Sequence, residues 1–537
     1  MPPPAPPAVR SLIDTRAAGG GIGFVEGVSG RSLEWAELPA HADRWRMAAA
    51  ALAPGDRVGL RMADPLAMIP ALLAALATGL VVAPLDPDCP PAELTALVRA
   101  LGLSAVAGDD GSADVLADAE VPALVVSGAE LRFTRRAARR DLVPPTAGSG
   151  SVAASAGSVA AGAGSVAAAA GAGLLLASSG TSGQRKLIVL SETQLLHTAS
   201  CIVAHHGLTP DDVGYSPLPL HHINGVVVGA LASLVGGHRL VVDRRFSASA
   251  FWDVVGRHRA TWVNLVPAII AVLAAAPAPG EEVAGRVAFA RSASAPLPVP
   301  ILRRFEQHTG IPVVETYGMT EAASQITANH RPPGRRKEGT VGVAVGVELH
   351  VVDPADRAAG ALAPGAVGEV EIRGRSVVER YMEPVGSANP WRPARAADGW
   401  LPTGDLGFLD GDGYLTLVGR ADDVINRGGE KVHPREVEDV LLAHPGVAAA
   451  AVVARPHPTV GEEPVAFVVP ATDPAGDPAG LVAELNHLCQ RHLSRFRRPA
   501  SITLVDALPA GTNGKVRRAE LRRRLADPAA GAQDGAA

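Results

Sequence analysis

The feature that most constrains this fold is an alternation, along the first 320 residues, of short apolar runs with segments long enough to form helices. The runs show no polar alternation, which is typical of strands buried on both faces of a parallel sheet. Strands that alternate with helices form sheets covered by helices. We therefore predict an α/β fold, with strands within 57–62, 80–85, 105–108, 123–127, 174–179, 239–243, 261–267, 287–294 and 312–318.

The sequence changes character after about residue 340, where short strand-like runs are separated by glycine-rich turns. Here Asp410–Gly413 (DGDG) predicts a hairpin turn. A smaller α+β segment begins at Arg420. Because a chain of 537 residues is too long for one core, we expect several domains. The predicted parts are a large domain (1–419), a small domain (420–525) and a disordered tail (526–537).

Composition places the chain among globular proteins. Hydrophobic residues make up 47% and charged residues 19%, and the net charge of −5 offers no basic excess for nucleic acid. The three cysteines, Cys89, Cys201 and Cys489, are scattered, which argues against a disulfide framework and suits a reducing cytoplasm. Their spacing is not that of zinc ligands. We expect a cytoplasmic protein with no nucleic-acid partner.

Residues 66–85 are apolar enough to suggest a membrane span. Pro70, Thr78 and Gly79 interrupt this stretch, so its pattern fits a buried helix, a stop at Gly79 and then a buried strand. We therefore expect no membrane insertion.

A low-complexity tract rich in Ala, Gly and Ser occupies residues 146–173. Its small side chains bury too little area to hold a core, so we predict a flexible surface insertion. The insertion lies directly before the most informative loop of the chain.

That loop, SSGTSGQRK, follows the apolar run LLLA. Small residues allow backbone N–H groups and hydroxyls to converge on a polyphosphate, and a lysine adds positive charge. The spacing excludes a Walker A loop, because two residues separate Gly183 from Lys186. A plain glycine-serine turn is the alternative. The candidate phosphate-binding residues are Ser178, Ser179, Gly180, Thr181, Ser182, Gly183 and Lys186.

The loop resembles the phosphate-binding signature of the acyl-adenylate-forming superfamily, which includes acyl-CoA synthetases, adenylation domains of peptide synthetases and firefly luciferase. The typical signature is [YF]-T-S-G-T-T-G-x-P-K-G. This chain departs from it with Arg185 in place of the proline and Leu187 in place of the last glycine. The hydroxyl-rich centre and the lysine are kept, so the resemblance implies the same role.

Four further motifs follow in the order of that superfamily. Residues 315–321 (ETYGMTE) resemble its Y-G-x-T-E motif, 401–405 (LPTGD) its T-G-D motif, 419–425 (GRADDVI) its hinge, and 509–518 (PAGTNGKVRR) its last motif. The resemblance implies a distorted β-barrel at the end of the large domain and a mobile small domain. It implies nucleotide contacts at Ser294, Ala295, Pro296, Glu315, Thr316, Tyr317, Gly318, Asp405 and Arg420.

The same resemblance implies ATP, Mg²⁺ and coenzyme A as the reaction's cofactors. Thr320 would contact the α-phosphate, Glu321 would hold Mg²⁺, and Lys515 would be the lysine of adenylate formation. A carboxylate attacking the α-phosphate brings two anions together, so positive charge is needed there. The small domain would then turn about Asp422 and bring Gly428 and Gly429 to a thiol path. An ordinary tight turn is the alternative for these two glycines.

The candidate acid pocket contains His221, His222, Asn224, Ser292 and Met319. Most of these are polar, and polar groups in a concave site orient a polar ligand. The surrounding segments resemble oxalate–CoA ligases and their small-acid relatives, which implies a small polar or aromatic acid. His221 and His222 as mere packing residues are the alternative.

Three functions are compatible with these motifs. The first is ATP-dependent activation of a carboxylic acid and transfer to coenzyme A. The second is a stand-alone adenylating enzyme that loads a carrier protein, or uses a non-thiol nucleophile or an oxyanion such as nitrite. The third is a non-catalytic binding protein, against which the presence of Lys515, Glu321 and Asp405 counts.

Overall fold

The computed structural model describes residues 8–49, 52–108, 123–127, 130–133, 171–178, 186–384, 387, 389–471, 478–510 and 516–526. The expected flexible insertion at 146–173 lies outside the described residues except for 171–173. The same holds for the phosphate-loop residues 179–185, for Lys515 and for the tail after Ala526. Ala526 itself, which we expected to begin the disordered tail, is the last residue of a helix.

The first of two large mixed sheets carries the predicted strands from the middle of the chain. Its order is β16-β15-β14-β13-β12-β10-β11-β1-β2 within the described residues, with parallel pairing from β14 to β1 and antiparallel strands at both edges. The strands are β1 (Ile22–Glu26), β2 (Ser32–Glu34), β10 (Val213–Ser216), β11 (Arg239–Val242), β12 (Trp262–Leu265), β13 (Phe289–Ser292), β14 (Val313–Tyr317), β15 (Thr327–Ala328) and β16 (Val343–Ala344).

The second large sheet carries the predicted strands nearer the N-terminus. Its order is β20-β19-β9-β8-β4-β3-β5-β6-β7 in the same described ranges, with parallel pairing from β8 to β6. The strands are β3 (Arg57–Arg61), β4 (Val81–Pro84), β5 (Ala105–Gly108), β6 (Ala123–Ser127), β7 (Glu130–Phe133), β8 (Gly173–Ser178), β9 (Lys186–Ser191), β19 (Arg380–Met382) and β20 (Trp391–Pro393).

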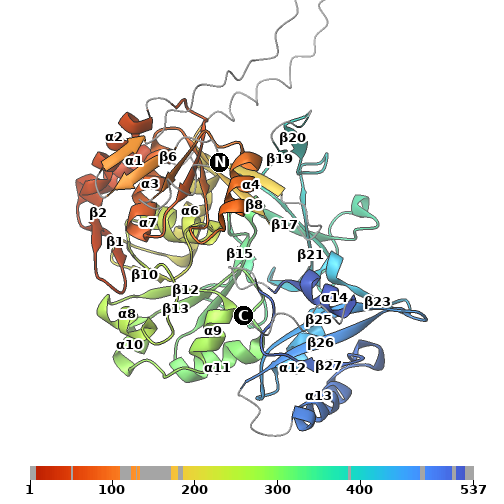
Figure 1. Ribbon diagram of the computed structural model, residues 1–537. Coiled ribbons are helices and arrows are strands. Elements are labelled where there is room, and N and C mark those ends of the chain that lie inside the picture. Colours follow the sequence, from red (N-terminus) through yellow and green to blue (C-terminus); the bar gives the residue numbers. More distant parts are fainter. Residues whose placement is uncertain are drawn as a thin grey trace, which may run out of the picture.

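Helices cover these sheets, as predicted (Figure 1). They are α1 (Val9–Gly19), α2 (Leu38–Ala48), α3 (Pro65–Ala77), α4 (Pro91–Leu101), α6 (Glu192–His206), α7 (Ala232–Gly236), α8 (Phe251–Arg257), α9 (Pro267–Leu273), α10 (Glu281–Arg286) and α11 (Val299–Thr309), with short helical turns at η1 (Trp35–Glu37), η6 (Thr320–Ala322) and η7 (Arg357–Ala359). A π-helix, η5, spans Gly225–Leu231.

Local signals fix the helix ends. Asp64 caps α3 by accepting from the Leu66 N–H, and Gly79 follows in the left-handed region at φ 87°. The predicted buried helix, stop and strand of 66–85 are thereby confirmed. A capping box between Ser191 and Gln194 starts α6. No helix in the described ranges is long and apolar enough to cross a membrane.

A four-stranded antiparallel sheet follows, with the order β17-β18-β21-β22. Its strands are β17 (Glu348–Val352), β18 (Gly368–Arg373), β21 (Leu401–Leu409) and β22 (Leu415–Arg420). The predicted hairpin at Asp410–Gly413 joins β21 to β22. The strand order does not close on itself within the described residues, so the expected distorted barrel is an open sheet here.

The C-terminal part is a smaller α+β unit, drawn in blue beside the rest in Figure 1. In the described residues its sheet has the order β24-β23-β26-β25, with β27 on β26. Its elements are η8 (Ala421–Asp423), β23 (Ile425–Arg427), β24 (Glu430–Val432), α12 (Pro434–Leu442), β25 (Val447–His457), β26 (Gly461–Pro470), α13 (Pro478–His492), η9 (Arg495–Arg497), β27 (Ile502–Leu504) and α14 (Arg518–Ala526). The predicted large α/β part and the smaller α+β part are both present.

Candidate active site

Three elements bring Tyr317, Asp405 and Arg420 together. Tyr317 ends β14 and donates its hydroxyl to the Asp405 carboxylate at 2.5 Å. Arg420, the cross-strand partner of Asp405 at the end of β22, donates from Nη1 to the other carboxylate oxygen at 3.1 Å. Residues predicted from separate motifs therefore meet at one point, and the carboxylate is held by two donors.

The loop after β14 has room for glycine alone at its first position, Gly318. A β-carbon on Gly318 would lie 1.5 Å from the carbonyl oxygen of Ser324. Ala323 (φ 54°) and Ser324 (φ 100°) both adopt positive φ, which is uncommon for residues with side chains. Backbone strain of this kind persists only where the surrounding structure enforces it, and it gathers at functional sites. Thr320 and Met319 lie in this tightly folded turn.

Glu321 and Lys186 both lie close to Tyr381. The Tyr381 hydroxyl donates to Glu321 Oε1 at 3.3 Å, and Lys186 Nζ lies 5.1 Å from the centre of the Tyr381 ring. Burial and the Glu321 carboxylate raise the pKa of Tyr381, so this hydroxyl stays protonated. A buried carboxylate with one occupied oxygen suits a divalent cation that prefers oxygen ligands, so Glu321 fits the expected Mg²⁺.

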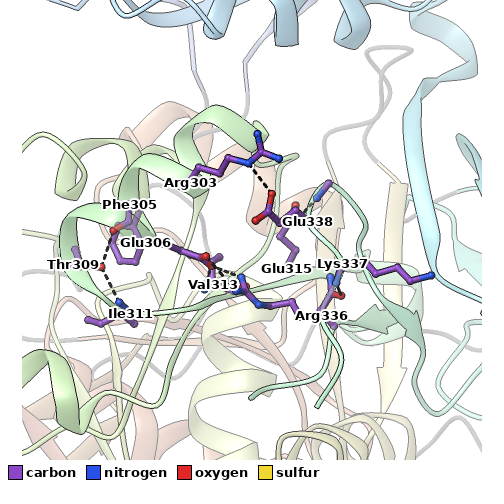
Figure 2. A network of polar contacts seen from close by, with 12 residues as sticks. Arg303, Phe305, Glu306, Thr309, Ile311, Val313, Glu315, Arg336, Lys337 and Glu338 are labelled. Carbon is purple, nitrogen blue, oxygen red and sulfur yellow. Dashed lines mark hydrogen bonds and ion pairs between the residues drawn. The ribbon is translucent and has the colours of Figure 1, made fainter. Parts of the chain in front are cut away.

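Glu315 has a structural partner. Its carboxylate accepts from the Gly339 N–H at 3.1 Å, and burial raises its pKa to about 8. Figure 2 shows it within a polar network in which Arg336 pairs with Glu306 of α11 and donates to the Val313 carbonyl at 2.9 Å. This network fixes the loop 336–339 against the base of β14.

The acid-pocket candidates fall into two groups. Asn224 donates to Ser294 Oγ at 3.4 Å and accepts from Asn264 at 2.9 Å, so two predicted residues, the buried Asn224 and the exposed Ser294, meet in one polar cluster. Ser294 has a φ of 74°. Ser292 is buried at the end of β13, and its backbone carbonyl accepts from Thr316.

The two histidines form the second group. Burial lowers the pKa of both, that of His222 to about 4, so both imidazoles are neutral at pH 7. Their rings lie 4.4 Å apart, and the buried His221 Nε2 makes no hydrogen bond in the described structure. His221 lines a cavity of about 250 Å³ at the ends of β4 and β11, beside Asp86 and Arg244. Polar side chains around this cavity form ion pairs, such as Arg244 with Asp88 at 2.9 Å.

The small-domain candidates are partly described. Asp422 lies in η8, two residues after Arg420. Gly428 (φ 60°) and Gly429 (φ 90°) form the two-residue turn between β23 and β24, where both positions require positive φ. The tight turn that we gave as the alternative is therefore present, and it leaves open space beside Gly429. Lys515 falls outside the described residues; its neighbour Val516 pairs with Ala510.

Comparison with known proteins shows which family the chain belongs to. The model of the AMP-binding enzyme family matches residues 15–382, and that of the AMP-binding enzyme C-terminal domain matches residues 436–515. The chain belongs to the AMP-binding enzyme family. The sulfoacetate–CoA ligase of Cupriavidus necator is 38% identical over 480 residues, or 88% of each chain. The oxalate–CoA ligase of Arabidopsis thaliana is 36% identical over 350 residues, which cover 64% of this chain and 66% of that enzyme.

The fold agrees with that placement. The crystal structure of ATP-bound MatB from Rhodopseudomonas palustris superposes with a TM-score of 0.79 at 27% identity, covering 97% of this chain and 100% of that one. This AMP-binding enzyme is accordingly an ATP-dependent acid–thiol ligase, which forms an acyl adenylate and passes the acyl group to coenzyme A. The predicted type of reaction and its cofactors, ATP, Mg²⁺ and coenzyme A, are confirmed.

Several side chains at the site were not predicted. Tyr381, Asn264, Arg291 and Gln325 were not among the candidates. Asn264 and Arg291 interrupt runs that are otherwise apolar, and they are cross-strand partners on β12 and β13. A polar residue inside a buried strand was the available signal.

Proposed function

We propose that this enzyme activates a small polar carboxylic acid as its adenylate and converts it to a coenzyme A thioester, with the residue roles that follow. The observation that carries the proposal is the meeting of Tyr317, Asp405 and Arg420 beside the tight loop at Gly318. A carboxylate held by two donors keeps lone pairs in a fixed direction, which suits two adjacent ribose hydroxyls. Residues 178–183 and Ser294–Pro296 would complete the nucleotide site.

The first half-reaction needs positive charge between two anions. The acid is already ionised, so no general base is required, and its oxygen attacks the α-phosphorus while pyrophosphate leaves. Lys515 would neutralise the attacking carboxylate and the α-phosphate, with Thr320 donating to the same phosphate. Lys186 would draw charge toward the leaving group, and Mg²⁺ held by Glu321 would supply further charge there.

The acid is proposed to be small and polar because most of the described pocket side chains are polar, and Asn224, Asn264 and Ser292 among them are buried. Asn224, Asn264 and Ser294 leave no continuous apolar wall in this part of the site. Two relatives named for small acids, sulfoacetate and oxalate, support the same choice.

The second half-reaction is proposed to follow a rotation of residues 420–525 against residues 1–419 about Asp422. Lys515 would leave the site, and the turn at Gly428 and Gly429 would approach it. Because glycine has no side chain, a pantetheine arm could pass close to the backbone at these two positions. The free thiols of Cys89, Cys201 and Cys489 support a cytoplasmic location.

The test is pyrophosphate release across a panel of small acids, each with and without coenzyme A. We expect release that yields a thioester and that Lys515→Ala reduces by at least about 100-fold, as expected when a group acting on developing charge is lost. Lys337→Ala is the matched control, because Lys337 pairs with Asp410 and Asp412 on the hairpin. Release that ignores coenzyme A but loads a carrier protein, or release independent of Lys515, would contradict the proposal.

A further inference from the structure

Arg291 is a buried cation without a counter-ion. It lies on β13, is 2% exposed, and has no carboxylate within ion-pair distance in the described part of the chain. Within the described residues, its side chain donates to two neutral amide oxygens, Asn264 Oδ1 at 3.1 Å and Gln325 Oε1 at 3.0 Å. Burying a charge without an opposite charge is costly, so such a group normally has a partner that completes it.

Two donors in this cluster also lack acceptors. Arg291 Nε and Gln325 Nε2 are buried and make no hydrogen bond within the described residues. Buried polar atoms in native proteins are nearly always satisfied, by protein, water or ligand. The Gln325 side chain lies beside the buried His206 imidazole, so the unmet capacity for an acceptor is that of Arg291 Nε.

One of the two hydrogen bonds from Arg291, the one to Asn264, leads on toward the acid pocket. Arginine only donates hydrogen bonds, so Asn264 must direct its amide oxygen toward Arg291, which leaves its NH₂ group to donate elsewhere. Asn264 then donates to Asn224, and Asn224 donates to Ser294 Oγ. Since Ser294 accepts from Asn224, its own hydroxyl hydrogen is free to point elsewhere.

We propose that Arg291 is a specificity-determining residue of the acid pocket, and that it selects an acid carrying a second anionic group, a carboxylate or a sulfonate. This inference rests on the proposed function. Through Asn264 and Asn224, Arg291 orients the donors that meet the acid, and its charge balances the second anionic group.

The reacting carboxylate cannot balance the charge of Arg291 throughout the reaction, so a second anionic group on the acid is needed. When the reacting carboxylate attacks the α-phosphorus, one of its oxygens becomes the bridging oxygen of the acyl adenylate. The carboxyl group then no longer carries a negative charge. It could not balance Arg291 through both half-reactions. A second anionic group keeps its charge from binding to thioester release. It therefore holds the acyl chain in place throughout.

The test uses pairs of acids that share a skeleton, in which one methyl group removes the second charge. Malonate is compared with monomethyl malonate, and sulfoacetate with methylsulfonylacetate, by kcat/KM for pyrophosphate release. We expect the charged member of at least one pair to be favoured by about 100-fold, the effect expected for a desolvated charge pair. The two pairs distinguish a carboxylate from a sulfonate as the second group.

Two variants separate charge from folding. Arg291→Met removes the charge at similar length, and Asn264→Asp keeps the volume while placing a carboxylate 3.1 Å from Arg291 Nη1. In both we expect the charged acid to lose its preference while the Kd for ATP is kept; Asn264→Asp covers the case in which Arg291→Met does not fold. Arg303→Met, at an exposed ion pair with Glu338, is the control.

The outcomes are distinguishable. If the wild type forms thioesters but favours the charged member in neither pair, or if Asn264→Asp leaves the preference unchanged, the inference is wrong and the proposed function stands. If no acid gives pyrophosphate, the proposed function fails and this inference fails with it.

Discussion

The contact between Tyr317 and Asp405 allows a sharp test by Tyr317→Phe. The substitution removes one hydroxyl and keeps the buried ring, so no cavity forms. A hydrogen bond to a charged group contributes about 1.5–3 kcal/mol. Because Arg420 still holds the other carboxylate oxygen, we expect a loss near the lower end, about 2 kcal/mol in the free energy of unfolding. In a domain of this size, that corresponds to a fall in Tm of about 2–3 °C.

The same substitution should weaken ATP binding. The Tyr317 hydroxyl and Arg420 together fix the direction of the Asp405 carboxylate, and losing one donor lets it rotate. We expect the Kd for ATP, measured by calorimetry, to rise by about tenfold, or about 1.4 kcal/mol.

Tyr414→Phe is the matched control. Its hydroxyl donates to a neutral acceptor, the Arg335 carbonyl, at 2.8 Å. We expect a loss of about 1 kcal/mol of stability and an unchanged ATP affinity. If Tyr317→Phe behaves like this control in both measurements, the Tyr317 hydroxyl does not orient Asp405 for the nucleotide.

Three further variants follow from the described geometry. Gly318→Ala should abolish pyrophosphate release with folding retained elsewhere, because its β-carbon would overlap the Ser324 carbonyl; activity near wild type would show that the loop can move. Burial raises the pKa of Glu315 to about 8, so its stabilising protonated form is lost as pH rises from about 4.5 through 8. Glu315→Gln should therefore gain a few degrees of Tm over wild type at pH 9 and not at pH 4, and equal gains at both would contradict this. Gly428→Ala with Gly429→Ala should slow thioester formation while sparing adenylate formation, since positive φ costs each alanine about 1 kcal/mol in the turn; equal losses in both steps would argue for a structural role alone.

The strands were predictable where burial on both faces makes a run uniformly apolar. The runs before Asp86, Asp243 and Gly318 all became strands of the parallel regions. The π-helix at Gly225–Leu231 was not predicted, because its residues are as apolar as a strand and its geometry depends on packing. A β-carbon at Gly225 would lie 2.5 Å from the Pro219 carbonyl oxygen, a contact that has no local sequence pattern.

The site was predictable where function requires a fixed local spacing. Tyr317 and Asp405 belong to short motifs, and the structure brings them together. Tyr381 lies 60 residues from Glu321 in a strand of three residues, so nothing local connects the two. Arg291 and Asn264 become neighbours only through the register of β12 and β13, which the sequence does not encode locally.

That register has a consequence for how such an enzyme diversifies. The proposed ribose contacts, Asp405 and Arg420, are on β21 and β22, whereas Asn264 and Arg291 are on β12 and β13, and Asn224 directly precedes the π-helix. A mutational library confined to Asn224, Asn264 and Arg291 would therefore explore new acids without touching the ribose contacts. Laboratory evolution of such a library should change the range of acids accepted by adding or removing charged side chains at these positions. The residues that carry out adenylate formation would stay the same.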